Sequence, residues 1–163
     1  MLPVPPSQSR LSHLRPQGGV RMVDVSAKPA TARTARARAR VLIPAAALRV
    51  LRQGTGPKGE VLEIARIAGI AAAKRAWELI PLCHPLPLSG IAMEARYVRG
   101  GIELRGQVST VAATGVEMEA LTAVSVAALT VYDMAKALGH EISFEVRLDF
   151  KSGGRSGTWK RAR

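Results

Sequence analysis

The segment from residue 114 to residue 140 restricts the fold more than any other, because it is long and carries few charged side chains. Between Glu119 and Asp133, apolar residues recur at helical spacing and cover the whole circumference of the predicted helix. A helix that is apolar on every side is buried, either in a core or in an interface between subunits. We expect this helix to end at Gly139. The apolar residues that cover its circumference are Leu121, Val124, Val126, Ala127, Leu129 and Val131.

Alternation with period two predicts the layer that covers this helix. In the segment 35–41 arginines alternate with small apolar residues, so a strand there has arginines on one face and a core-facing surface on the other. Two further runs joined by a turn at Arg99–Gly101 predict a β-hairpin, and residues 141–151 predict a last strand. A second helix is expected from about residue 60 until Pro81 stops it. Together these elements predict an α+β sandwich.

The positive charge of the chain is concentrated at its two ends. The formal net charge is +12, whereas residues 41–150 carry eleven basic and eleven acidic side chains, so the excess lies in residues 1–40 and 151–163. This distribution favours basic tails or an anion site over a basic domain face. The chain also has only two Phe, two Tyr and two Trp as platforms for bases. Nucleic-acid binding is therefore kept only as the alternative function of this chain.

Composition also bears on the compartment and on the number of domains. The single cysteine, Cys83, cannot form an internal disulfide and fits a cytoplasmic location. No uninterrupted apolar run approaches the roughly 20 residues of a membrane-spanning helix, so we expect no membrane partner. Residues 1–21 are expected to form a flexible, basic, proline-rich leader, and residues 158–163 a basic tail. A single domain at 22–157 lies between them.

Cys83 stands next to His84 in the proline-rich stretch LIPLCHPLPLSG. A zinc site needs about four ligands, and the sequence offers no second pair at ligand spacing, so we expect no metal site. A cysteine nucleophile needs a base within reach, whereas adjacent side chains of an extended chain point in opposite directions. Two interpretations remain open. The histidine is satisfied by a backbone carbonyl, or Pro81 and Pro85 hold the segment extended as a stiff wall of a binding site.

Several stretches together resemble the molybdenum-cofactor biosynthesis protein C family, the cyclic pyranopterin monophosphate synthases. The motifs are MVDVSAK, KGE, ARIAGI, LIPLCHPL, TGVEMEALTAVSVAALT, YDM and KSGG, and they run from about Met22 to Gly157. The resemblance implies a ferredoxin-like α+β fold and a homohexamer, a trimer of dimers, with active sites at subunit interfaces. It implies a lyase that converts a cyclised GTP derivative, 3′,8-cyclo-7,8-dihydro-GTP, to cyclic pyranopterin monophosphate with release of pyrophosphate. The resemblance also implies that no cofactor is required and that any Mg²⁺ would act on the substrate phosphates.

The resemblance also implies roles for particular residues of this chain. Asp133 matches the active-site aspartate of the family, and Lys58 and Lys136 match its two essential lysines. Ala113 stands where some relatives carry a basic residue. Two matched segments are implied to bind substrate: Leu82, Cys83 and His84 form the first, and Met118 and Glu119 form the second. Five basic positions are implied to meet the triphosphate: Lys28, Arg33, Arg36, Lys151 and Arg155.

The chemistry of ring opening and closure requires proton transfer, for which lysine and aspartate are suitable. A lysine that is desolvated or lies beside another cation has its pKa lowered towards neutrality, whereas arginine stays protonated. Glu119 and Asp133 are fourteen positions apart, roughly 21 Å along a helix, so they cannot serve one small reacting centre in a single chain. Either they hold opposite ends of an extended ligand, or an oligomer brings two copies together. A non-catalytic nucleotide-binding scaffold is a further alternative.

Overall fold

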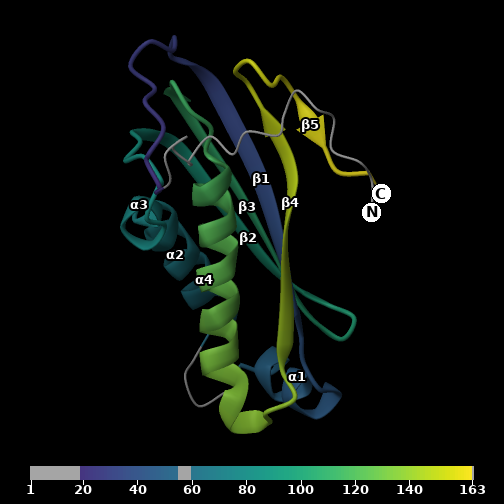
Figure 1. Ribbon diagram of the computed structural model, residues 1–163. Coiled ribbons are helices and arrows are strands. Elements are labelled where there is room, and N and C mark those ends of the chain that lie inside the picture. Colours follow the sequence, from purple (N-terminus) through teal and green to yellow (C-terminus); the bar gives the residue numbers. More distant parts are fainter. Residues whose placement is uncertain (1–18, 55–59, 163) are drawn as a thin grey trace.

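Five antiparallel strands form a single sheet in the order β2–β3–β1–β4–β5. In this computed structural model residues 19–54 and 60–162 are described. The predicted strand and hairpin are confirmed, and Figure 1 shows that the strands are long and run side by side. The strands are β1 (Thr31–Leu42), β2 (Leu88–Val98), β3 (Gly101–Ala112), β4 (Ser143–Ser152) and β5 (Trp159–Lys160).

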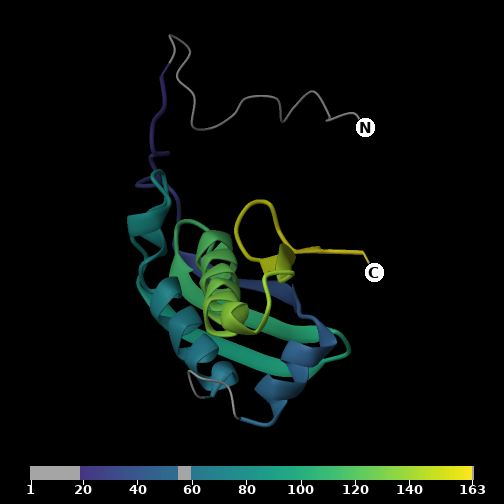
Figure 2. The same cartoon turned by 90° about the horizontal axis from the view of Figure 1, so that it is seen from below.

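Helices cover one face of this sheet, and α2 and α4 lie next to each other there (Figures 1 and 2). The other face carries the arginines that alternate along β1, as the sequence predicts. The predicted α+β class is therefore confirmed. The helices are α1 (Ala45–Arg52), α2 (Val61–Ala73), α3 (Ala76–Leu79) and α4 (Glu117–Ala135), and the 3-10 turn η2 (Lys136–Leu138) follows α4.

The helix expected between residue 60 and Pro81 is divided in two, and this part of the prediction is wrong. Arg75 leaves the helical conformation, with φ −118° and ψ 14°, and its N–H donates to the carbonyl of Ala72 at 3.0 Å. The chain turns at this point and buries Ala76. The helix α1 was not predicted at all, although its three buried residues follow helical spacing at Ala47, Leu48 and Leu51.

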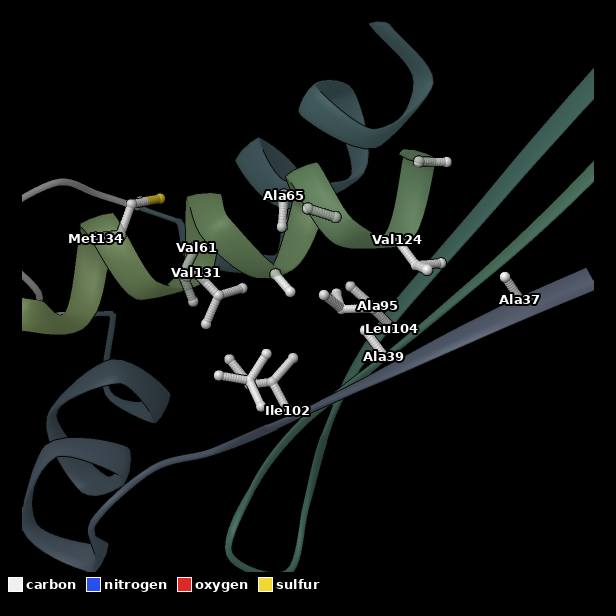
Figure 3. Packing of buried hydrophobic residues seen from close by; sticks show 14 of the residues in the cluster. Ala37, Ala39, Val61, Ala65, Ala95, Ile102, Leu104, Val124, Val131 and Met134 are labelled. Atoms are coloured by element: carbon white, nitrogen blue, oxygen red, sulfur yellow. The ribbon is translucent and has the colours of Figure 1, made fainter. Parts of the chain in front are cut away.

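Small side chains allow α4 to lie close to the sheet. Ala35, Ala37 and Ala39 of β1 are buried, and so are Ala120 and Ala127 of α4. Ala37 and Ala39 lie on the side of β1 that faces the helices (Figure 3). Larger buried side chains such as Ile102 and Leu104 of β3 fill the space between the sheet and the helices. Each such side chain contributes roughly 1.5–3 kcal/mol by leaving water.

Residues 117–138 form a helix that is long and apolar enough to cross a membrane, with a mean hydropathy of 1.3, although no uninterrupted apolar run reaches that length. In this fold ten of the residues of α4 are buried. They pack against β1, β3, β4 and α2, which is the environment of a core helix in a globular protein. The sheet and α2 thus account for the buried apolar residues of α4.

Candidate active site

Two segments that were expected to bind substrate meet at the amino-terminal end of α4. The thiol of Cys83 lies 3.5 Å from Oε1 of Glu119, as a donor to the carboxyl group. Glu119 is only 3% exposed, and its Oε2 has no hydrogen-bond partner among the described residues. A buried carboxyl oxygen without a partner is costly, and it is the kind of group that a ligand satisfies.

Burial is the largest influence on the pKa of both groups. It raises the pKa of Cys83 to about 12, and the charge of Glu119 adds to this effect. Burial also raises the pKa of Glu119, and the nearby Glu117 carboxylate acts in the same direction. Cys83 is therefore a neutral thiol at physiological pH, which agrees with the expectation that it is not a nucleophile.

His84 makes a backbone contact, as one of the two interpretations predicted. Its Nε2 lies 2.8 Å from the carbonyl oxygen of Val23, which joins the segment before β1 to the segment before β2. The stretch before His84 is less extended than expected. The N–H of Cys83 donates to the carbonyl of Ile80 at 3.0 Å, so Pro81 occupies the second position of a tight turn.

Asp133 and Lys136 lie at the opposite end of α4. Their side chains form an ion pair of 2.7 Å, and each side chain is about half exposed, at 55% and 51%. The hydrogen bond to Asp133 and its negative charge raise the pKa of Lys136. This is the reverse of the lowered pKa that a lysine reaches by desolvation, so in this protomer Lys136 is a firmly protonated ammonium group.

A pocket of about 410 Å³ gathers three of the basic residues that were expected to meet phosphates. Lys28, Arg33 and Arg155 line it, and Lys151 lies beside it with its Nζ on the hydroxyl of Ser156. The positive side chains come from three distant parts of the chain, namely the segment before β1, β1 itself and the segment after β4. Their convergence gives this part of the pocket lining a positive charge.

The start of α4 forms another wall of the same pocket. Residues 113–115 and Glu117 line it, and Val116 makes no side-chain capping bond among the described residues. The amides of the first turn therefore add the positive end of the helix dipole. Arg33 is fixed against this wall, because Nε and Nη2 each lie 3.3 Å from the carbonyls of Ala112 and Ala113. Some relatives carry a basic residue at the position of Ala113, and in this chain the guanidinium of Arg33 is the cation next to that position.

The glycines of the loop after β4 allow it to approach Arg33 closely. Gly153 and Gly154 have φ of 95° and 68°, a conformation that side-chain-bearing residues rarely adopt. A Cβ on Gly153 would overlap the carbonyl of Ala32, and one on Gly154 would overlap the guanidinium of Arg33. The sequence motif KSGG is the signal for this wall, since paired glycines mark close backbone contact.

Arg36 does not join this pocket within one protomer. It lies three positions after Arg33 on β1, so its side chain emerges on the open face of the sheet. There its Nε donates to Gln107 at 2.7 Å, and its guanidinium lies 4.8 Å from the ring centroid of Phe150. Lys58 lies outside the described residues. Glu117, Ser152 and Ser156 line the pocket and were not among the predicted site residues.

Comparisons with known proteins decide which family this arrangement belongs to. The model of the MoaC family matches residues 22–154. A cyclic pyranopterin monophosphate synthase of Streptomyces avermitilis is 52% identical over 98% of this chain and 95% of its own length. The proteins with the same name from Thermomicrobium roseum and Novosphingobium aromaticivorans are 53% and 52% identical, over 94% and 93% of this chain. The chain belongs to the MoaC family.

The resemblance stated from the motifs is thereby confirmed. The MoaC match covers both ends of α4 and most of the basic pocket, including Lys28, Arg33 and residues 113–117. It ends before Arg155, and β5 lies beyond it. The pocket thus combines residues inside the family match with residues that follow it.

Proposed function

We propose that this chain converts 3′,8-cyclo-7,8-dihydro-GTP to cyclic pyranopterin monophosphate and releases pyrophosphate, as a lyase of molybdenum cofactor biosynthesis. The observation that carries this proposal is the identity of about half of all residues with synthases of that name, over nearly the full length of both chains. The geometry supports it, because a substrate with a triphosphate and a purine-derived ring needs both an anion pocket and proton donors.

The triphosphate binds in the basic pocket. Lys28, Arg33 and Arg155 neutralise its charge, and the first amides of α4 donate to its oxygens. Lys151 stands next to this pocket and supplies a further ammonium group. The ring portion then extends towards the unpartnered Oε2 of Glu119, where a polar ring atom satisfies the buried carboxyl group.

Proton transfer is the role of Asp133, Lys136 and Lys58. The ion pair holds Lys136 protonated before the reaction, which supports a role as general acid for this lysine. Asp133 orients the ammonium group and, when Lys136 is regenerated, relays a proton back to the neutral amine. Lys58 is assigned to the same task from the family motif alone.

A second copy of the chain completes the site. Met118 and Leu129 are 36% and 54% exposed, and with the half-buried Leu121 and Ser125 they form a stripe along α4 between the two groups of site residues. If two copies pack this stripe around a twofold axis near its middle, the Glu119 end of one α4 lies beside the Asp133 end of the other. The stripe supports active sites shared between two subunits, and the ferredoxin-like protomer and the trimer of dimers are proposed from the family resemblance.

A divalent ion enters, if at all, on the phosphates of the substrate. Within residues 19–54 and 60–162 no group of three or more His, Cys, Asp or Glu side chains is arranged to hold a metal. Phosphate oxygens would therefore supply the ligands of Mg²⁺, with water as the remainder. The single thiol fits function in the reducing cytoplasm.

Turnover by the purified full chain tests this proposal. The chain is incubated with 3′,8-cyclo-7,8-dihydro-GTP, and cyclic pyranopterin monophosphate and pyrophosphate are measured. We expect Asp133→Asn and Lys136→Ala to lower kcat about a hundredfold or more, the usual contribution of a positioned acid or base. Lys74→Ala, which removes an exposed lysine after α2, is the matched control and should keep its activity. Full turnover by Asp133→Asn would refute the assigned role.

A further inference from the structure

The short strand β5 closes the loop that forms one wall of the basic pocket. It pairs with β4, so that Trp159 lies opposite Lys151 and Lys160 lies opposite Phe150. Residues 153–158 connect the two strands, and Gly153, Arg155 and Ser156 of this loop line the pocket together with Ser152 at the end of β4. The pairing therefore fixes the second end of a loop whose first end is fixed by β4.

Arg161 extends this attachment beyond β5. Its backbone N–H donates to the carbonyl of Asp149 at 2.9 Å, and its side-chain Nε donates to the carbonyl of Leu148 at 2.8 Å. Its guanidinium also lies 5.6 Å from the ring centroid of Trp159. Two contacts of Arg161 thus hold the end of the chain against β4, and the third joins Arg161 to Trp159 of β5.

The loop is poorly suited to hold its shape without this attachment. Gly153, Gly154 and Gly157 all have positive φ, and glycine loses more conformational freedom on ordering than other residues. Within the loop, the N–H of Gly157 donates to the carbonyl of Gly154 at 3.0 Å. Arg155 is exposed between these glycines, so its position depends on both ends of the loop.

We propose that β5 and Arg161 are a positioning element, which holds Arg155 and Ser156 at the pocket and so strengthens the binding of a triphosphate group. The residues 159–161 are not among those that line the pocket in the described chain, so they act through the loop. The inference rests on the proposed function, because it takes the pocket as the phosphate site. It goes beyond the family match, which ends at residue 154.

Two substitutions of Arg161 in the full chain separate its contributions. Arg161→Pro removes the backbone donor and the side chain, whereas Arg161→Ala removes the side chain alone. Lys160→Ala is the matched control, since it removes one positive charge from the same strand and none of the contacts of Arg161. Binding of inorganic tripolyphosphate is measured by calorimetry. We expect roughly five- to tenfold weaker binding by Arg161→Pro, a smaller loss by Arg161→Ala, and a change within about twofold for Lys160→Ala.

Hydrogen exchange and kinetics identify which part of the inference fails. In Arg161→Pro the amides of residues 152–157 should exchange faster while those of α4 do not, and KM should rise with kcat retained. A cooperative thermal unfolding transition would show that Arg161→Pro is folded. If Arg161→Pro does not fold, the same measurements are made on Arg161→Ala. Unchanged tripolyphosphate binding and KM in both variants would overturn the positioning element and leave the proposed function intact. An unmodified chain that turns over substrate yet binds no tripolyphosphate would overturn the phosphate pocket, and the positioning element with it.

Discussion

At the scale of single residues, Cys83 and Glu119 show how burial opposes the ionisation of acidic groups in a site. The thiol and the carboxyl group lie 3.5 Å apart, and each would repel the other if both were ionised. Burial is the larger cause for both, and it raises the pKa of each group. Burial therefore opposes ionisation of both groups, so the environment that Cys83 and Glu119 offer a ligand differs from that of the cations in the basic pocket.

The first prediction concerns the reactivity of Cys83. Because its pKa is about 12 instead of 9.0, the thiolate is scarce at pH 8, and alkylation should be at least about tenfold slower in the folded chain than in the unfolded chain. The rate of modification by iodoacetamide, followed by mass spectrometry with and without urea, measures this. Cys83→Ala should keep most of its turnover. Equal alkylation rates in the two states, or complete loss of turnover, would contradict the prediction.

The second prediction concerns the pH dependence that Glu119 contributes to stability. Burial makes the pKa of Glu119 higher in the folded chain than in the unfolded chain. Above pH 4.5, the ordinary pKa, Glu119 is therefore protonated to a greater extent in the folded chain than in the unfolded chain. The free energy of unfolding therefore falls as pH rises from 4.5 through the raised pKa, by at most about 1.4 kcal/mol per pH unit.

Glu119→Gln removes this titration and nearly preserves the shape of the side chain. Urea unfolding between pH 4 and pH 8 should show a smaller loss of stability with rising pH in the variant than in the unmodified chain. Taking the difference between the two curves removes the opposite effect of Glu103. Burial tends to raise the pKa of that carboxyl group, but the hydrogen bond from Arg96 and the charge of Arg105 lower it. Parallel curves would show that Glu119 does not titrate in this range.

At the scale of elements, β1 separates two sets of arginines by the simple alternation of a strand. Arg33 turns to the helical side and lines the basic pocket, whereas Arg36, Arg38 and Arg40 turn to the open face. On that face Arg38 is paired with Asp149 at 3.1 Å and with Glu103 at 3.4 Å. The charge of the open face is thus partly neutralised within the protomer, whereas the pocket concentrates positive charge.

The third prediction uses this alternation as an internal control. Arg33→Ala should raise KM for the triphosphate substrate roughly ten- to a hundredfold, the range expected for loss of a hydrogen bond to a charged group. Arg36→Ala removes the same side chain from the same strand and should change KM by no more than about twofold. Steady-state kinetics of the two variants make the comparison. An equal effect of both substitutions would mean that the open face also meets the substrate.

The elements that the sequence predicted are those with a regular pattern. The alternation of β1 and the apolar circumference of α4 follow from side-chain periodicity, and both are present. β5 was missed because two residues are too few to show a period, and their backbone pairing leaves no mark in the sequence. The contact between His84 and Val23 joins positions 61 residues apart, so only the tertiary fold reveals it.

At the scale of the whole molecule, the length of α4 separates the two halves of the candidate site. Cys83 and Glu119 lie at the start of this helix, and Asp133 and Lys136 lie at its end, roughly 21 Å away along the axis. A single protomer therefore cannot bring all four side chains to one reacting ring. If a dimer joins them, each site takes one end of α4 from each copy, and a dimer contains two such sites.

The fourth prediction tests this sharing by mixing two inactive variants. Glu119→Ala damages one half of each site and Asp133→Ala the other half. In a mixed dimer one site carries both substitutions and the other carries neither. After the two variants are unfolded together and refolded at equal amounts, random pairing gives about one quarter of the sites an intact set of residues. Turnover should therefore rise to roughly a quarter of that of the unmodified chain. A mixture that stays as inactive as its components, while forming mixed oligomers by native mass spectrometry, would show that each site belongs to one protomer.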